Sequence, residues 1–232
     1  MQVMAVAVAI DDRTDVLGHL AEYLGRSKSD VICDLNVWGN SQVPLARLWR
    51  EMQPQTPEEF DRFYQDGKGL YLPDLVAFNT SPYYWQRASL SLKVSGRVVD
   101  FGGGIGTLSI ALAQQGCEVT YVDLESPQRR FAEWRFRRLG LPVKVVSSLH
   151  EVDAVDHLDA VDVMEHIHPQ VLPEVIGEFA RIVRKGGTVN TINDFGAQPD
   201  LPQHQNTEME FDRLMRKAGF WGGSVRWMKA LV

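Results

Sequence analysis

The pattern of hydrophobic and polar residues divides the chain near residue 95. Before that point apolar residues recur at helical spacing, and after it short apolar runs alternate with amphipathic stretches. The clearest helix start is Thr56-Pro57-Glu58-Glu59, with Thr56 as N-cap, Pro57 as first helical residue and Glu59 able to reach back to the cap amide. Gly67 is expected to end this helix. Further helices are expected over residues 15–24, 43–52 and 81–90.

The second part of the chain predicts alternating strands and helices. Strands are expected over 97–100, 117–123, 143–146, 157–163 and 188–192, and helices over 107–115, 126–139 and 169–183. Such alternation implies right-handed βαβ units, and therefore a Rossmann-like α/β fold with a mostly parallel sheet and helices on both faces. After a loop and a helix over 208–218, we expect one terminal strand, 225–232. We therefore expect residues 1–94 to form a helical N-terminal extension and residues 95–232 to form the Rossmann-like domain.

Composition narrows the classes of partner. The net charge of −6 argues against a nucleic-acid backbone, so no DNA partner is expected. The two cysteines, Cys33 and Cys117, have neither disulfide nor metal-ligand spacing, which favours a cytoplasmic location. The apolar run over residues 3–10 is too short to span a bilayer and lacks the flanks of a signal peptide, so no membrane association is expected.

The strongest chemical signal is Asp100-Phe101-Gly102-Gly103-Gly104-Ile105-Gly106, in which a strand ends in an acid and glycines open a helix. Glycine lets the backbone turn tightly and lie against a ligand. Asp123 ends the second predicted strand, where a carboxylate can accept hydrogen bonds from both hydroxyls of a ribose. Thr107 breaks the dinucleotide fingerprint, and the acid before the glycines suits an ammonium group rather than a pyrophosphate. S-adenosylmethionine, which has an amino group, a ribose and no phosphate, fits this pattern.

These residues resemble those of class I S-adenosylmethionine-dependent methyltransferases. Val99 to Gly106 resembles the first motif of that family, Asp159 to Ile167 resembles the fourth-strand motif of a branch with a Glu-His pair, and Phe179 to Gly187 resembles the turn before strand five. The resemblance covers about residues 95–232 and implies S-adenosyl-L-methionine as cofactor. The residues expected to bind it are Asp100, Gly102, Gly103, Gly104, Gly106, Asp123, Leu124, Ser147, Ser148, Val161 and Asp162. The two serines stand where family members often carry an acid beside adenine.

Candidate catalytic residues follow the fourth predicted strand. Methyl transfer depends largely on alignment, and a base is needed only if the acceptor carries a proton. We expect Asp162 near the methionine part and His166 as candidate base, the alternative for His166 being a helix-start residue that holds the backbone. His168 is expected to be an exposed turn residue. No metal ligands are assigned, although Asp162 with Asn193 and Asp194 resembles, in reversed order, sets that hold Mg²⁺ for catechol-type acceptors.

The favoured function is methylation of a small-molecule acceptor at oxygen, nitrogen or carbon. An RNA or protein methyltransferase is the first alternative, and its candidate surface is the arginine-rich helix with Arg129, Arg130, Arg135, Arg137 and Arg138, unless that helix simply presents a solvated face. A non-catalytic S-adenosylmethionine-binding module is the second. The extension, with aromatic residues 83–85, is expected to cover the carboxyl edge of the sheet and help enclose the acceptor, or else to form a homodimer interface. The 194–207 loop, with His204, is a candidate lid.

Overall fold

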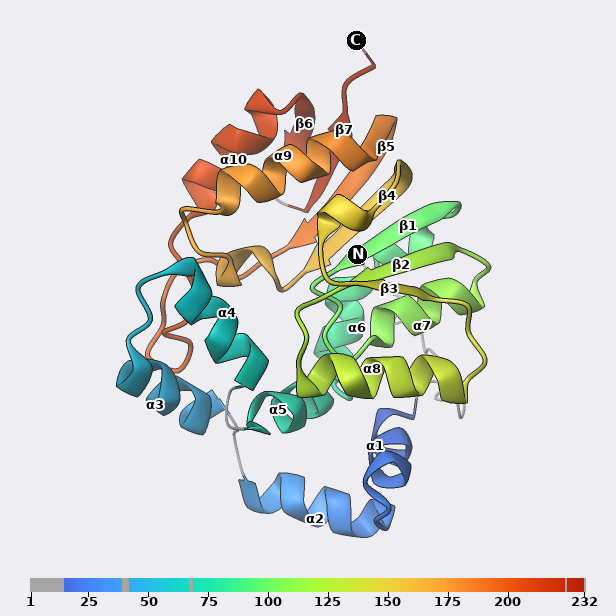
Figure 1. The fold of residues 1–232 in the computed structure, drawn as a ribbon, viewed down its shortest axis with the longest axis vertical. Helices are drawn as coiled ribbons and strands as arrows, with labels where there is room; N and C mark the ends of the chain where they lie inside the picture. The colour runs from blue at the N-terminus through green and yellow to red at the C-terminus, as the bar shows by residue number, and fades with distance from the viewer. Residues whose placement is uncertain (1–14, 39–41, 67–68, 224, 232) are drawn as a thin grey trace, which may run out of the picture.

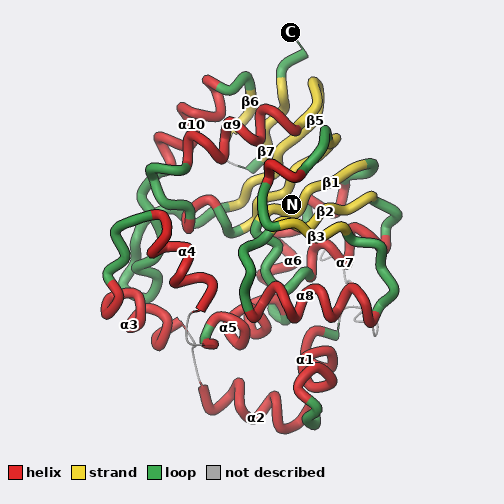
Figure 2. Tube along the Cα trace, viewed as in Figure 1, coloured by secondary structure: helices red, strands yellow, loops and turns green. Residues whose placement is uncertain are grey.

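The computed structural model describes residues 15–38, 42–66, 69–223 and 225–231 (Figure 1). The apolar run over residues 3–10 and Gly67 therefore lie outside the described residues. The described part of the extension is helical, as Figure 2 shows. Its helices are α1 (Val16–Leu24), α2 (Lys28–Trp38), α3 (Gln42–Met52), α4 (Pro57–Asp66), α5 (Tyr71–Asn79) and α6 (Pro82–Ala88).

A mixed sheet with helices on both faces follows the extension, which confirms the predicted fold class. Its strands are β1 (Arg97–Phe101), β2 (Glu118–Val122), β3 (Lys144–Val146), β4 (Val155–Val161), β5 (Val183–Ile192), β6 (Phe220–Gly223) and β7 (Arg226–Lys229). The strand order is β3-β2-β1-β4-β5-β7-β6, in which β1 to β5 run parallel. The helices between them are α7 (Thr107–Gln114), α8 (Pro127–Arg138), α9 (Leu172–Ile182) and α10 (Glu208–Lys217).

The end of the sheet corrects the prediction of one terminal strand. Two strands, β6 and β7, form an antiparallel hairpin, and β7 also pairs antiparallel with β5. The sequence of β6 is Phe-Trp-Gly-Gly, too short and too rich in glycine to give a strand signal. Gly222 has φ 131°, and a Cβ there would lie 2.4 Å from the Arg226 carbonyl oxygen, so this close pairing requires glycine.

The helix caps predicted from the sequence are present in the structure. Thr56 Oγ1 accepts the Glu59 amide at 3.3 Å, while the Glu59 carboxylate accepts the Thr56 amide at 3.2 Å. Ser81 caps α6 and Ser126 caps α8 through their hydroxyls, which accept the amides of Tyr84 and Arg129. These bonds satisfy amides that the first turn of a helix leaves unpaired.

The extension and the sheet domain share a hydrophobic cluster. Val16 and Leu20 of α1 and Val76 of α5 pack with Ile105 and Phe131 of the sheet domain. In the same region the buried guanidinium of Arg135, on α8, donates to the Ile105 carbonyl at 2.6 Å, to Thr107 Oγ1 and to His19 Nδ1 on α1. The predicted division near residue 95 is therefore crossed by packing and by hydrogen bonds.

The parallel strands direct their carboxyl ends towards α4 and α5, as Figure 1 shows. Ligands of open α/β sheets bind at this edge. No helix within the described ranges is long and apolar enough to cross a membrane.

Candidate active site

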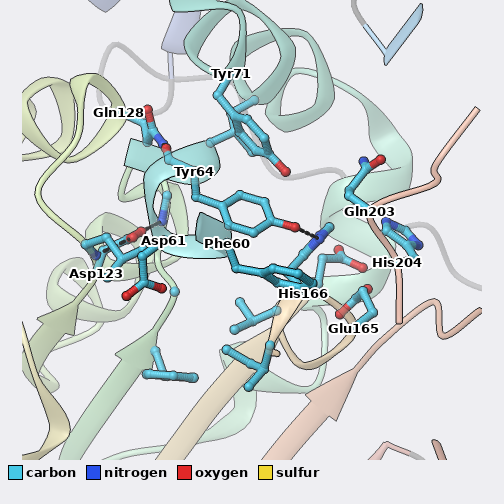
Figure 3. A pocket seen from close by; sticks show the side chains of 18 of the residues that line it. Phe60, Asp61, Tyr64, Tyr71, Asp123, Gln128, Glu165, His166, Gln203 and His204 are labelled. Atoms are coloured by element: carbon cyan, nitrogen blue, oxygen red, sulfur yellow. Dashed lines mark hydrogen bonds between the residues drawn. The ribbon is translucent and has the colours of Figure 1, made fainter. Parts of the chain in front are cut away.

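A cavity of about 380 Å³ lies at the carboxyl ends of β1, β2 and β4. The sheet domain lines one side, and helices α4, α5 and α6 of the extension line the other. We call one part of this cavity the glycine-loop end, lined by Gly102, Gly104, Asp123, Leu124 and Ser147, and the other the histidine end, lined by Tyr64, Glu165, His166, Gln203 and His204. Figure 3 shows Asp123 and the two histidines on opposite sides of Tyr64.

The glycines form the turn between β1 and α7. Gly102, Gly104 and Gly106 have φ of 67°, 55° and 73°, a region that side chains with a Cβ rarely adopt. A Cβ on Gly102 would lie 2.3 Å from the Val163 side chain. Of the predicted glycines, Gly102 and Gly104 line the cavity.

Gly103 and Gly106 serve the packing of this turn. A Cβ on Gly103 would lie 2.6 Å from the Tyr121 ring, and one on Gly106 would lie 2.6 Å from the Phe136 ring. These glycines let the loop lie close against aromatic side chains, so the loop keeps a fixed shape.

Asp123 follows β2 and holds the loop. Its carboxylate accepts the Gly104 amide at 2.7 Å, the Leu124 amide at 2.7 Å and the Tyr121 hydroxyl at 3.2 Å. Burial raises the pKa of this carboxyl to about 6, although these hydrogen bonds lower it in part. A carboxylate has about four acceptor positions, and the Tyr121 hydroxyl donates more closely to the Gly104 carbonyl, at 2.6 Å, so Asp123 can still accept hydroxyl donors from the cavity.

Besides Gly103 and Gly106, three predicted cofactor residues do not line the cavity: Asp100, Ser148 and Val161. Asp100 is buried and its carboxylate accepts the Ser109 hydroxyl at 2.6 Å; burial raises its pKa to about 7. Ser148 caps a short turn by accepting the His150 amide, whereas Ser147 lines the cavity and accepts Arg129 Nη1 at 2.8 Å. Val161 packs against the hydrophobic core.

Asp162 is paired with an arginine of the extension. The Arg87 guanidinium, from α6, donates to both carboxylate oxygens, through Nε at 2.9 Å and through Nη2. Burial raises the pKa of Asp162, and Arg87 opposes that effect. Asp162 has a φ of 56°, which is uncommon for a residue other than glycine and marks a turn held by its surroundings. Sequence reasoning missed Arg87, because nothing local links it to a residue 75 positions away.

The histidine end contains groups from three distant segments. The Tyr64 hydroxyl lies 3.0 Å from His166 Nδ1, and the His166 and His204 rings meet edge to face with centroids 4.7 Å apart. His204 Nδ1 donates to the Asp194 carbonyl at 2.7 Å. Burial lowers the pKa of His166 to about 3, so its ring is neutral near pH 7. Sequence reasoning did not single out Tyr64 or Gln203, and it named Glu165 only as part of the Glu-His pair of the fourth-strand motif.

His168 and Asn193, near the carboxyl ends of β4 and β5, bear on two further expectations from the sequence. His168 is buried against the Phe60 ring of α4 and bonded to the Gln55 carbonyl, so the expectation of an exposed turn residue is wrong. The reason is that α4 covers this turn. Asn193 Oδ1 accepts the Met164 amide, so one of the two lone pairs of this oxygen is already used within the fold.

The arginines of α8 are compensated by acids or buried. Arg130 pairs with Glu125, Arg137 with Glu133 and Arg138 with Glu22. Arg129 bonds Glu133 and Ser147, and Arg135 is fully buried. The face of this helix is therefore a mixed-charge surface rather than a basic stripe.

Comparison with known proteins decides the family. Residues 82–221, well over half of the chain, match the family model described as methyltransferase domain. The chain belongs to this family. This membership confirms the family predicted from the sequence.

Among individual proteins, this chain is 32% identical to a ubiquinone biosynthesis O-methyltransferase from Photorhabdus laumondii subsp. laumondii over 106 residues. That match covers 42% of this chain and 43% of the relative, so the chain spans less than half of its length.

Solved structures share the fold. A 1,6-didemethyltoxoflavin-N1-methyltransferase from Burkholderia thailandensis superposes with a TM-score of 0.56 and 19% identity, covering 76% of this chain and 92% of that one. An O-methyltransferase family protein from the same organism has a TM-score of 0.55 and 15% identity, covering 92% of this chain and 88% of that one.

Proposed function

We propose that this protein transfers the methyl group of S-adenosylmethionine to a small-molecule acceptor. The observation that carries the proposal is a single cavity of about 380 Å³ that joins the glycine loop and Asp123 to a polar, aromatic-lined histidine end. A cofactor at one end and an acceptor at the other would meet inside one enclosure. Both reactants are thereby held in the alignment that displacement needs.

The glycine-loop end suits the nucleoside part of the cofactor. The Asp123 carboxylate can accept the ribose hydroxyls, with Leu124 and Ser147 beside the adenine. The methionine part would lie towards Asp162 and Arg87, which offer an anion for its ammonium group and a cation for its carboxylate. Asp100 would hold the glycine loop from the protein interior, because its buried carboxylate accepts the Ser109 hydroxyl.

The chemical step is a direct displacement at the methyl carbon. The bond from the acceptor atom to that carbon forms while the carbon–sulfur bond breaks, and the electron pair stays on sulfur as a thioether. If the acceptor carries a proton, that proton must leave, and the neutral His166 ring at the histidine end would accept it and become an imidazolium. The aromatic rings of Phe60, Tyr64 and Tyr71 would pack against the acceptor and exclude water.

The identity of similar proteins supports a small acceptor. The relative from Photorhabdus laumondii is an O-methyltransferase of ubiquinone biosynthesis, and the Burkholderia N1-methyltransferase was solved with 1,6-didemethyltoxoflavin and S-adenosylhomocysteine bound. An RNA acceptor is less favoured, because the arginines of α8 are paired or buried. A non-catalytic binding module is less favoured because the cavity continues beyond the glycine-loop end to the histidine end.

Calorimetry with the full chain tests the cofactor part. We expect micromolar-range binding of S-adenosylmethionine and S-adenosylhomocysteine and no binding of NAD, since the dinucleotide fingerprint is broken by Thr107. Binding of NAD without the sulfonium cofactor would refute the proposal.

A transfer assay tests the acceptor part. S-adenosylmethionine with a labelled methyl group is incubated with pools of small metabolites and, separately, with RNA and protein. Label in a small molecule is the expected result, and label in RNA or protein alone would favour the alternative.

A further inference from the structure

We propose that Glu165, His166 and His204 form a binding site for one divalent transition-metal cation at the histidine end of the cavity. Each residue offers a ligand atom, and these atoms lie within 4.8 Å of one another. Two ligands of one ion at metal bonds of 2.0–2.2 Å lie at most about 4.4 Å apart, so small side-chain rotations would complete the site. The proposal goes beyond methyl transfer, because the cation can be measured without any acceptor.

Only one of the two carboxylate oxygens of Glu165 accepts a hydrogen bond from the described residues. Its Oε1 accepts the Asp194 amide at 2.8 Å, while Oε2 is buried and, among the described residues, has no hydrogen-bond partner. Glu165 is 1% exposed, so its unpaired oxygen cannot reach bulk water. A buried polar oxygen without a hydrogen-bond partner is costly unless a cation or a donor from a ligand faces it.

The two imidazoles are oriented by their other nitrogens. The Asp194 carbonyl can only accept, so His204 Nδ1 carries the proton and Nε2 of the neutral ring has the lone pair. His166 Nδ1 is bonded to the Tyr64 hydroxyl, which can accept a hydrogen bond from Nδ1–H, and in that tautomer the lone pair of Nε2 is available for a metal. Metal-binding histidines are commonly fixed in this way, by donation from the second nitrogen to an oxygen.

The donor set indicates which cation fits. Two imidazole nitrogens and one carboxylate oxygen suit Zn²⁺ or Fe²⁺, whereas Mg²⁺ prefers oxygen ligands throughout. All three residues line the cavity, so an ion bound by them would lie beside the space proposed for the acceptor. Gln203, whose buried Oε1 also has no partner among the described residues, lies beside His204 in Figure 3.

If the protein transfers methyl groups as proposed, the cation would also have a role in that reaction. An acceptor hydroxyl bound to the cation loses its proton to solvent more readily, and the resulting oxygen anion attacks the methyl carbon. His166 would then be a ligand rather than a base. This favours acceptors that carry a hydroxyl group.

The test measures metal binding by the full chain, without acceptor. The protein is stripped with a chelator, dialysed and titrated with Zn²⁺, Co²⁺ and Mg²⁺ by calorimetry, and the visible absorption of bound Co²⁺ is recorded. We expect one equivalent of Zn²⁺ or Co²⁺ and none of Mg²⁺. Glu165→Gln and His204→Asn should weaken binding at least tenfold, and Tyr64→Phe, which keeps all ligands, by about 10–100-fold.

His150→Ala is the matched control, because His150 is an exposed histidine between Glu174 and Glu178 where adventitious metal would collect. It should leave the stoichiometry and affinity unchanged. No stoichiometric Zn²⁺ or Co²⁺ on the unmodified protein would overturn the proposal, and so would equal affinity in the Glu165 and His204 variants. Should those variants fail to fold, the Co²⁺ spectrum and the stoichiometry of the unmodified protein decide. Cofactor affinity, measured on the stripped protein, reports on the proposed function separately.

Discussion

The two ends of the cavity are built in different ways. The glycine-loop end consists mainly of backbone and of Asp123, in the short segments that directly follow β1, β2 and β3. The histidine end consists of side chains from α4, from the turn after β4 and from the loop before α10. A site made of backbone depends on local conformation, whereas a site made of distant side chains depends on the packing of the whole chain. Substitutions at the two ends should therefore have different effects on stability and on binding.

The largest effect is expected at Gly102. Gly102→Ala places a side chain at φ 67° and 2.3 Å from Val163, with strain of about 1–2 kcal/mol and overpacking of about 1–3 kcal/mol. Urea unfolding and cofactor calorimetry should both show a loss. Gly116→Ala is the control, because its φ is 88° but nothing lies within 4 Å of the added carbon. Equal losses in the two variants would mean that the close approach at Gly102 has no importance.

Arg87 joins the two parts of the chain at the boundary between the ends. Arg87→Met leaves the partly buried Asp162 carboxylate without its partner, so we expect the free energy of unfolding to fall by about 1.5–3 kcal/mol. The double variant Arg87→Met with Asp162→Asn should lose less than the sum of the single variants, as measured by urea unfolding. Additive losses would show that the pair is not coupled.

Asp123 tests the glycine-loop end alone. Asp123→Ala removes the acceptor for ribose hydroxyls, which should weaken cofactor binding by about 1–3 kcal/mol. Calorimetry measures the loss, and circular dichroism checks that the fold survives. Metal affinity at the histidine end should stay unchanged. An unaltered cofactor affinity would mean that the ribose binds elsewhere.

The smallest effect concerns Asp100 and pH. Burial raises its pKa from 3.8 to about 7 in the folded protein, with Asp159 and Asp123 adding repulsion. Between these values the folded state holds a proton that the unfolded state has lost, so stability falls as pH rises. Asp100→Asn removes this contribution. The stability of the variant relative to the unmodified protein should rise by about 1–2 kcal/mol from pH 5.5 to 7, measured by urea unfolding without cofactor. A difference that does not change with pH would contradict the shifted pKa.

The sequence predicts well those elements, in both parts of the chain, whose signals are local. Hydrophobic runs, the caps at Ser126 and Thr56, and the glycine loop each specify structure within a few residues. The errors lie where local signals are weak. Helix α5 has Pro73 near its start, and β6 has two glycines in four residues, so neither gives a clear pattern.

The site was predictable to the same extent. Gly102, Gly104, Asp123, Leu124, Ser147, Asp162 and His166 line the cavity as a motif-based interpretation expects. The motifs assigned no role in the site to Arg87, Tyr64 or Glu165. Their roles depend on contacts with residues that are distant in sequence, or on burial, and no local pattern reveals either. His204 was singled out only as part of a lid, and the structure brings its ring to His166.

The buried guanidinium of Arg135 bears on what counts as a unit of this protein. The part recognisable by common ancestry begins at residue 82, yet Arg135 donates to His19 of α1, and Ile105 and Phe131 pack against α1 and α5. A fragment cut at residue 82 would keep the inherited motifs while exposing apolar side chains and removing one partner of a buried charge. The segment that matches the family model is thus shorter than the segment whose residues pack together in the fold. Recombination at that border would transmit the cofactor motifs without the stability on which they depend.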